Sequence, residues 1–236
     1  MFDRVTLWVD IAATLADTLL LARVLMLRLQ RVYLYLTLFC TLGVFFDGVQ
    51  LWFGIHSDES QRIFIYTRFL YAFLYPLAAW DVFEEIKPHI QQMRRLALGS
   101  LVTGLLFAAI FGFLVSLFVT TDENQPVISG TIALVLWAGS SVATLGFLWS
   151  LHRALRAQQT PIPNNTFVWL IFLQLSLVAE LVACFGGIFA QLASATVTSV
   201  LDLCLLTYGL AITIWCAAKL RRVPSDVPTP ASPGTA

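Results

Sequence analysis

Charged residues are scarce in this sequence. Only 12% of the 236 residues are Asp, Glu, Lys or Arg, whereas 58% are hydrophobic and the mean hydropathy is +0.81. A soluble domain carries about 25% charged residues, so this composition excludes a soluble fold. The net charge is zero, which gives no reason to expect nucleic acid or an acidic substrate as a partner.

Cysteine and histidine are also few, and neither forms a chemically suggestive pattern. The four cysteines lie inside apolar segments, with no pair at metal-ligand or redox spacing, which predicts reduced packing residues. His56, His89 and His152 fall in or beside loops. Membrane haem proteins and zinc-dependent membrane hydrolases carry their His ligands on helices. We therefore expect no metal, no cofactor and no enzymatic activity.

Long apolar runs dominate what remains. A helix needs about 20 apolar residues to cross the hydrocarbon core, and a helix satisfies its own backbone hydrogen bonds there. The expected fold class is therefore all-α, a polytopic bundle of seven transmembrane helices within residues 1–222. Residues 223–236, rich in Pro, Ser, Thr and Ala, are expected to form a disordered tail. The seven helices are predicted at residues 5–27, 32–54, 62–84, 97–120, 128–150, 166–190 and 196–218.

The basic residues of the short loops predict the orientation of the bundle. Lys and Arg occur in the first, third and fifth loops and after the last helix, whereas the three intervening loops read IHSDES, TDENQP and QLASA and contain neither. Because positive charge is retained on the cytoplasmic side, the N-terminus is expected outside and the C-terminus in the cytoplasm. The expected location is the cell membrane, as a multi-pass protein.

Ionisable residues inside the predicted helices are the strongest functional signal. Each costs about 2.5–3.5 kcal/mol near the centre of a membrane helix, so they should face the bundle interior and require partners, water or protonation. Two of them, Asp10 and Asp81, lie near helix ends and are expected to contact interfacial water. The full set is Asp10, Asp17, Arg23, Asp47, Arg68, Asp81, Glu180 and Asp202.

Counting residues from the outer helix ends places Asp47, Arg68, Asp10 and Asp202 at similar depths in the outer half of the membrane. The second and third helices form a hairpin with a short outer loop, so we predict an ion pair between Asp47 and Arg68. The pair is interpreted either as a register-fixing contact between helices or as part of a ligand site.

Asp17 and Glu180 come out nearer mid-depth, without an obvious cation. They are interpreted either as a proton or cation site or as protonated acids that hydrogen-bond a neighbouring helix. Tyr71 and Tyr75 share nearly one face with Arg68 and are added as candidate ligand contacts. Pro76 lies inside the third predicted helix and is expected to bend it.

The predicted topology is similar to that of rhodopsins, G-protein-coupled receptors and small sugar transporters, but their motifs are missing. A retinal pigment needs a Lys in the seventh helix, whereas Lys87 and Lys219 lie at the cytoplasmic boundary. The Asp-Arg-Tyr and Asn-Pro-x-x-Tyr signatures of the receptors and the Pro-Gln pairs of the transporters do not occur. Topology alone does not assign a function.

Three functions remain open from the sequence. The first is a receptor-like or sensory protein that binds a small ligand or ion in the outer-half polar cluster and signals through a cytoplasmic partner. The second is a proton- or cation-coupled transporter of small solutes that uses Asp17 and Glu180. The third is a structural subunit of a membrane complex, supported if Gly139, Ser140 and Ser141 form an exposed small-residue face. The fourth helix has no ionisable residue at mid-depth and is expected to face lipid or a partner.

Overall fold

The computed structural model of the chain describes residues 2–54, 57–90, 94–118, 130–158, 162–190 and 195–222. Within these residues the protein is entirely helical, with no strand. The predicted tail at residues 223–236 lies outside them. Two short 3-10 turns, Leu29–Arg31 and Lys87–His89, accompany the α-helices. The α-helices are α1 Phe2–Met26, α2 Leu34–Phe53, α3 Asp58–Ile86, α4 Arg94–Phe118, α5 Gly130–Gln158, α6 Asn164–Ala190 and α7 Ala195–Lys219.

Six of these helices, all except α4, are long and apolar enough to cross a membrane. The described part of α4 contains a shorter apolar stretch, Leu101–Leu114. The all-helical fold class is confirmed, and the architecture is that of a multi-pass membrane protein. The longest departure from the predicted boundaries is α5, which continues to Gln158 rather than residue 150. A helix keeps its own hydrogen bonds past the apolar run, so it has no need to end there.

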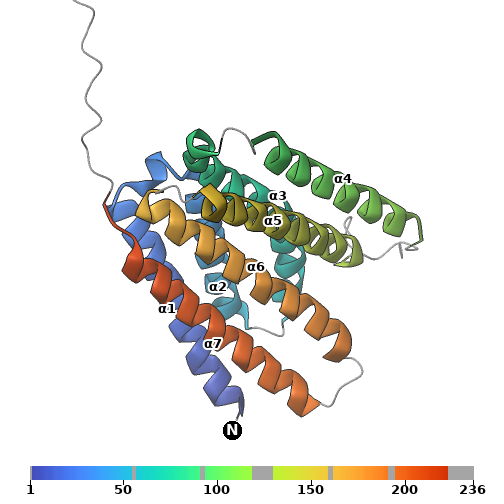
Figure 1. The fold of residues 1–236 in the computed structure, drawn as a ribbon. Coiled ribbons are helices and arrows are strands. Elements are labelled where there is room, and N and C mark those ends of the chain that lie inside the picture. The colour runs from blue at the N-terminus through green and yellow to red at the C-terminus, as the bar shows by residue number, and fades with distance from the viewer. Residues whose placement is uncertain are drawn as a thin grey trace, which may run out of the picture.

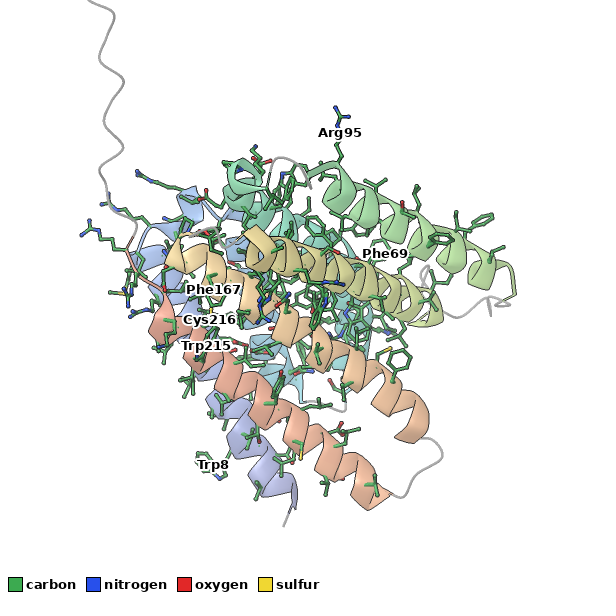
Figure 2. All side chains as sticks on the ribbon, viewed as in Figure 1. Trp8, Phe69, Arg95, Phe167, Trp215 and Cys216 are labelled. Atoms are coloured by element: carbon green, nitrogen blue, oxygen red, sulfur yellow. The ribbon has the colours of Figure 1, made fainter. Side chains whose placement is uncertain are left out.

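The helices pack as a bundle with α4 at its edge (Figure 1). α1 lies beside α2 and α7, α6 joins α7 to α5, and α3 packs against α2 and α5. The main contacts of α4, in the part of the chain that is described, are with α5. Trp8 extends from α1 near one end of the bundle and Arg95 from α4 near the other (Figure 2). These side chains suit the two membrane interfaces.

α3 and α5 run in the same direction along each other. Arg68 contacts Trp137, the Ala72 carbonyl accepts a hydrogen bond from Ser140, and Phe83 packs against Phe147 with ring centroids 5.7 Å apart. The residue numbers rise together along both helices, as they do only in parallel helices. The segment between them, which includes α4, must therefore bring the chain back from one end of the bundle to the other.

Small residues fix the contact between α4 and α5. A Cβ atom added to Gly104 would lie 2.6 Å from the Ala143 Cβ, and one added to Gly139 would lie 2.7 Å from the Ala108 Cβ. Glycine is needed at both positions because the two backbones approach so closely. Gly139, Ser140 and Ser141 do not form the exposed face that would have supported a structural-subunit role: Gly139 contacts α4, and the two serines are 3% and 1% exposed.

Pro76 lies within α3 without ending it. Proline has no N–H, so the carbonyl four residues earlier, that of Ala72, loses its helical donor. The Ser140 hydroxyl of α5 donates to this carbonyl instead. A neighbouring helix thus satisfies the backbone group that the proline leaves free, as membrane helices require.

Side-chain hydrogen bonds join the ends of α1 and α7 to each other and to the start of α6. Arg23 donates from α1 to the Leu220 carbonyl after α7 at 2.9 Å. The Asn165 side chain donates to the Arg221 carbonyl at 2.7 Å and accepts from the Arg221 N–H at 2.8 Å, while Asn164 donates to the Lys219 carbonyl. The last carbonyls of α7 are thereby satisfied by α1 and α6.

Asp81 is buried, with 7% exposure, and caps α2 rather than contacting interfacial water as predicted. Its Oδ2 accepts a hydrogen bond from the Leu36 N–H at 3.0 Å, which serves one of the unsatisfied donors at the start of that helix. Nearby, the Tyr33 hydroxyl lies 2.9 Å from the Thr166 Oγ1. Burial raises the pKa of Tyr33 to about 12, so its phenol stays neutral and keeps this bond at ordinary pH.

Candidate functional site

The best-defined polar contact inside the bundle joins Arg68 of α3 to Glu180 of α6. The Arg68 Nη1 lies 2.7 Å from the Glu180 Oε2, and the Tyr75 hydroxyl donates to the Glu180 Oε1 at 3.1 Å. The predicted ion pair between Asp47 and Arg68 is therefore wrong, because in the part of the chain that is described Arg68 pairs with Glu180. Tyr75 had been named as a candidate ligand contact near Arg68, and in the structure its hydroxyl binds Glu180.

Arg68 and Glu180 lie at one level of the bundle, because their side chains are in contact. Counting residues from the ends of the predicted helices placed Glu180 deeper than Arg68, although α6 does run to Ala190 as predicted. Residue counting therefore misjudged the level at which the two helices meet.

Aromatic rings enclose the Arg68 guanidinium. Its Cζ lies 4.6 Å from the centre of the Phe64 ring, one turn earlier on α3, and 4.4 Å from the Trp137 ring of α5. Such contacts stabilise a desolvated cation by about 2 kcal/mol or more. Tyr71 stacks on Tyr75 with ring centroids 5.4 Å apart, so two tyrosines line the opposite flank of the ion pair. The charge is held in one orientation.

A second polar cluster joins α1, α2 and α7. The carboxyl groups of Asp17 and Asp47 lie close enough to interact electrostatically with each other, and Thr213 lies beside Asp17. Two ionised carboxylates repel each other strongly in a poorly solvated interior. A proton held by one of them removes this repulsion and supplies a hydrogen-bond donor. The Asp47 Oδ2 is buried and has no partner among the described residues.

Tyr71 lies between the two clusters. It is close enough to interact electrostatically with Arg68 and Glu180 on one side and with Asp47 and Asp17 on the other. Its hydroxyl lies close to α2, since a Cβ added at Gly43 would be in ordinary contact with the Tyr71 Oη at 3.5 Å. The polar network thus involves α1, α2, α3, α6 and α7.

Asp202 does not join this network. It is exposed on α7, near the end where that helix begins. Asp10 lies close enough to Asp47 to act on it electrostatically, although its own Oδ2 has no partner in the described residues. The sequence correctly grouped polar helix faces, but it did not show which faces meet.

Two residues of the site were missed as candidates. Trp137 has a signal in the sequence, since it precedes Ser140, Ser141 and Thr144 on a polar stripe of an otherwise apolar helix. Thr213 lies on the same face of α7 as Asp202, about three turns further along, where it is beside Asp17 of α1. A hydroxyl in a membrane helix is common, so that signal alone is weak.

Among the residues that the structure describes, no three His, Cys, Asp or Glu side chains gather closely enough to hold a metal ion. The carboxyl pair and the ion pair therefore remain as the chemically distinctive features. Comparison with protein-family models, curated proteins and solved structures finds no match of any of the three kinds.

Proposed function

We propose that this chain is a non-enzymatic, receptor-like membrane protein that binds a proton at the Asp17–Asp47 pair. It crosses the bilayer seven times with its N-terminus outside and its C-terminus in the cytoplasm. Its cytoplasmic output passes to a separate protein partner. The observation that carries the proposal is the close approach of two buried carboxyl groups from different helices, Asp17 of α1 and Asp47 of α2, with no paired cation beside them in the described residues.

This pair responds to pH through a simple contact between helices. With one proton, the two carboxyl groups attract each other and hold α1 against α2. Without it, two negative charges face each other in a poorly solvated interior, where like charges repel strongly. The groups around them, Asp10, Thr213 and Tyr71, supply no positive charge of their own. Loss of the proton therefore favours separation of the helices.

A proton suits this site better than a metal cation. A cation needs several oxygen ligands at once, whereas the third acid, Asp10, does not complete such a set with Asp17 and Asp47 in the described residues. One shared proton satisfies the geometry with two carboxyl groups alone. The positive charge of Arg68 is already paired with Glu180.

Two features of the fold support the proposed topology. α1 and α7 are parallel, because Asp17 meets Thr213 and Arg23 meets Leu220 in the same order along both. α3 and α5 are also parallel, which requires the segment containing α4 to return across the bundle. With an odd number of crossings, the two ends of the chain lie on opposite sides.

Infrared difference spectroscopy of the purified protein in nanodiscs tests the proton site. Raising the pH is expected to remove a carbonyl stretching band that belongs to a buried protonated carboxyl group. The same band should be missing in Asp47→Asn and in Asp17→Asn, because either variant lacks one half of the pair. Asp202→Asn is the matched control, since Asp202 is exposed and should leave the band unchanged.

A band that persists in both variants, or a wild-type protein with no such band at any pH, contradicts the proposal. Glu180→Gln is not a useful test of the proton site. It removes the ion-pair partner of Arg68, so it changes the stability of the bundle as well as removing a carboxyl group.

Proton- or cation-coupled transport is the second candidate, favoured by the position of Tyr71 between the carboxyl pair and the Arg68–Glu180 pair. Transporter sites are commonly built from interrupted helices, whereas α1, α2, α3, α6 and α7 are continuous at the network. Proton flux in liposomes across an imposed pH gradient separates the two candidates. Flux that disappears in Asp47→Asn supports transport, and pH-dependent infrared bands without flux support sensing.

A further inference from the structure

Three polar side chains of α5 are buried without a hydrogen-bond partner in the described part of the chain. They are Trp137, Ser141 and Thr144, with exposures of 3%, 1% and 0%. The unpartnered atoms are the indole Nε1 and the two hydroxyl oxygens. An unpaired polar group costs more in a membrane interior than elsewhere, because lipid offers no substitute partner.

These three residues form one stripe along α5. Their spacing of four and then three residues repeats once per helical turn, so they point in nearly the same direction. Ser140, on one side of this stripe, contacts α3, and His152, on the other side, contacts Gln174 of α6 at 3.2 Å. The stripe therefore faces the seam where α5 meets both α3 and α6.

Further unpartnered donors lie on the other two helices of this seam. On α3, the Nε of Arg68 has no partner among the described residues, and its guanidinium lies against the Trp137 ring. On α6, the Nε2 of Gln174 also lacks one, although its Oε1 faces His152. Indole and guanidinium nitrogens only donate. The seam therefore needs a ligand that accepts hydrogen bonds.

We propose that a chain of ordered water molecules occupies this seam, running inward along α5 from the Arg68–Glu180 pair. The charge of Arg68 is balanced by Glu180, so the seam has no excess positive charge to attract an anion. Water is neutral, accepts from the indole and guanidinium donors, and both donates to and accepts from the hydroxyls. It satisfies every unpartnered group with one small molecule type.

The hydroxyls of Ser141 and Thr144 support the assignment of water to the seam, because they make no hydrogen bond within their own helix. A Ser or Thr in a helix commonly donates to the carbonyl four residues earlier, as Thr67 does to the Ile63 carbonyl at 2.8 Å. Ser141 and Thr144 make no such bond in the structure. Their hydroxyls remain available to groups in the seam.

This inference goes beyond the proposed function, because it concerns a different part of the bundle from the Asp17–Asp47 pair. A hydrated seam would give the Arg68–Glu180 pair a polar environment deep in the protein. Its success or failure leaves the infrared test of the carboxyl pair unaffected.

Nuclear magnetic resonance of the full-length protein in nanodiscs, with nitrogen-15 tryptophan, tests the water chain directly. The indole proton of Trp137 is expected to show a cross peak to water and rapid exchange into deuterium oxide. Trp169 is the matched comparison, since its Nε1 is also unpartnered but it packs among the rings of Tyr33 and Phe172. Trp137→Phe and Trp169→Phe assign the two signals. A Trp137 indole without a water cross peak, and with slow exchange, overturns the proposal.

Thermal unfolding of the purified protein gives a second test. In a hydrated seam, Thr144→Val and Ser141→Ala remove hydrogen bonds to water and should lower the melting temperature. In a dry seam they remove unpaired polar groups, so the melting temperature would stay the same or rise. Thr67→Val is the control for the loss of a buried hydroxyl whose partner is its own helix. An unchanged or raised melting temperature in both seam variants overturns the proposal.

Discussion

Arg68 shows what a charged side chain requires inside a membrane bundle. One carboxylate balances its charge, and two aromatic rings cover the faces of its guanidinium. The side chain is 16% exposed, so little of its original hydration remains. The pair as a whole is neutral, but each member alone is not. The energetic importance of the pair therefore lies in the cost of breaking it.

Removing either member of this pair should be more damaging than removing both. Arg68→Ala or Glu180→Ala strands a buried charge and is expected to lower the free energy of unfolding by about 3–5 kcal/mol. The double substitution should cost less than the sum of the two single ones. Reversible unfolding in mixed detergent micelles measures all three, and the double-mutant cycle gives the coupling between the residues.

The same cycle between Arg68 and Asp47 should give a much smaller coupling energy. Equal coupling in the two cycles would mean that Arg68 divides its charge between both acids, contrary to the geometry. Asp202→Ala is the control for loss of an acid from the same set, because that residue is exposed.

The composition of the site could be read from the sequence better than its pairing. Asp17, Asp47, Arg68, Tyr71, Tyr75 and Glu180 all belong to the network, since an intramembrane charge has few alternatives to the interior. Which acid reaches Arg68 depends on where each helix ends and how far it tilts, and both must be known to within one helical turn. Residue counting does not provide that precision, so Asp47 was paired with Arg68 and Glu180 was left without a cation.

At the scale of helices, Pro76 and Ser140 form one unit from two elements. The proline leaves the Ala72 carbonyl of α3 without its helical donor, and the Ser140 hydroxyl of α5 donates a hydrogen bond to that carbonyl. Ser140→Ala should therefore destabilise the protein by about 1–3 kcal/mol, the cost of a buried acceptor without a partner. In a Pro76→Ala background the alanine N–H restores the helical bond, and the same substitution should cost distinctly less.

Thermal unfolding of the four proteins in this cycle measures the effect. Additive changes would show that Ser140 acts independently of the proline. The sequence predicts the bend at Pro76, because proline chemistry is local. It does not identify Ser140, since its contact with Ala72 spans 68 positions of the chain.

The α4–α5 contact makes a prediction about glycine. Gly139→Leu places a large side chain where even a Cβ would meet Ala108 at 2.7 Å, and it should displace α4 from α5. Gly146→Leu on the same helix is the matched control, because nothing lies within 4 Å of its Cβ position. Limited proteolysis of the loops flanking α4 is the measurement. Equal protection of the two variants would contradict the close packing.

Helix positions were predicted well because a membrane span is set by the length of an apolar run, which is local. The lateral arrangement of the helices was not predicted well. A small-residue face at Gly139, Ser140 and Ser141 indicates close packing but does not identify the neighbouring helix. Gly139 contacts α4, whereas Ser140 contacts α3. The expectation that α4 lies at the edge agrees with its main contact being α5 alone.

For the whole molecule, the parallel course of α3 and α5 makes the topology testable with two thiol positions. In a background without the native cysteines, Glu59→Cys at the start of α3 should react with an impermeant thiol reagent only from outside. Arg153→Cys near the end of α5 should react only from the cytoplasmic side. Inside-out and right-side-out vesicles provide the comparison, and labelling of both positions from one side would contradict seven crossings.

The long separation of partners in this network has a consequence for biosynthesis. α3 leaves the ribosome with an arginine whose carboxylate follows 112 positions later and with a free carbonyl whose hydroxyl follows 68 positions later. Alone in lipid, that arginine costs about 2.5–3.5 kcal/mol on insertion scales. We therefore expect α3 to be less stable in lipid before α5 and α6 are made than afterwards, because those two helices supply the missing partners.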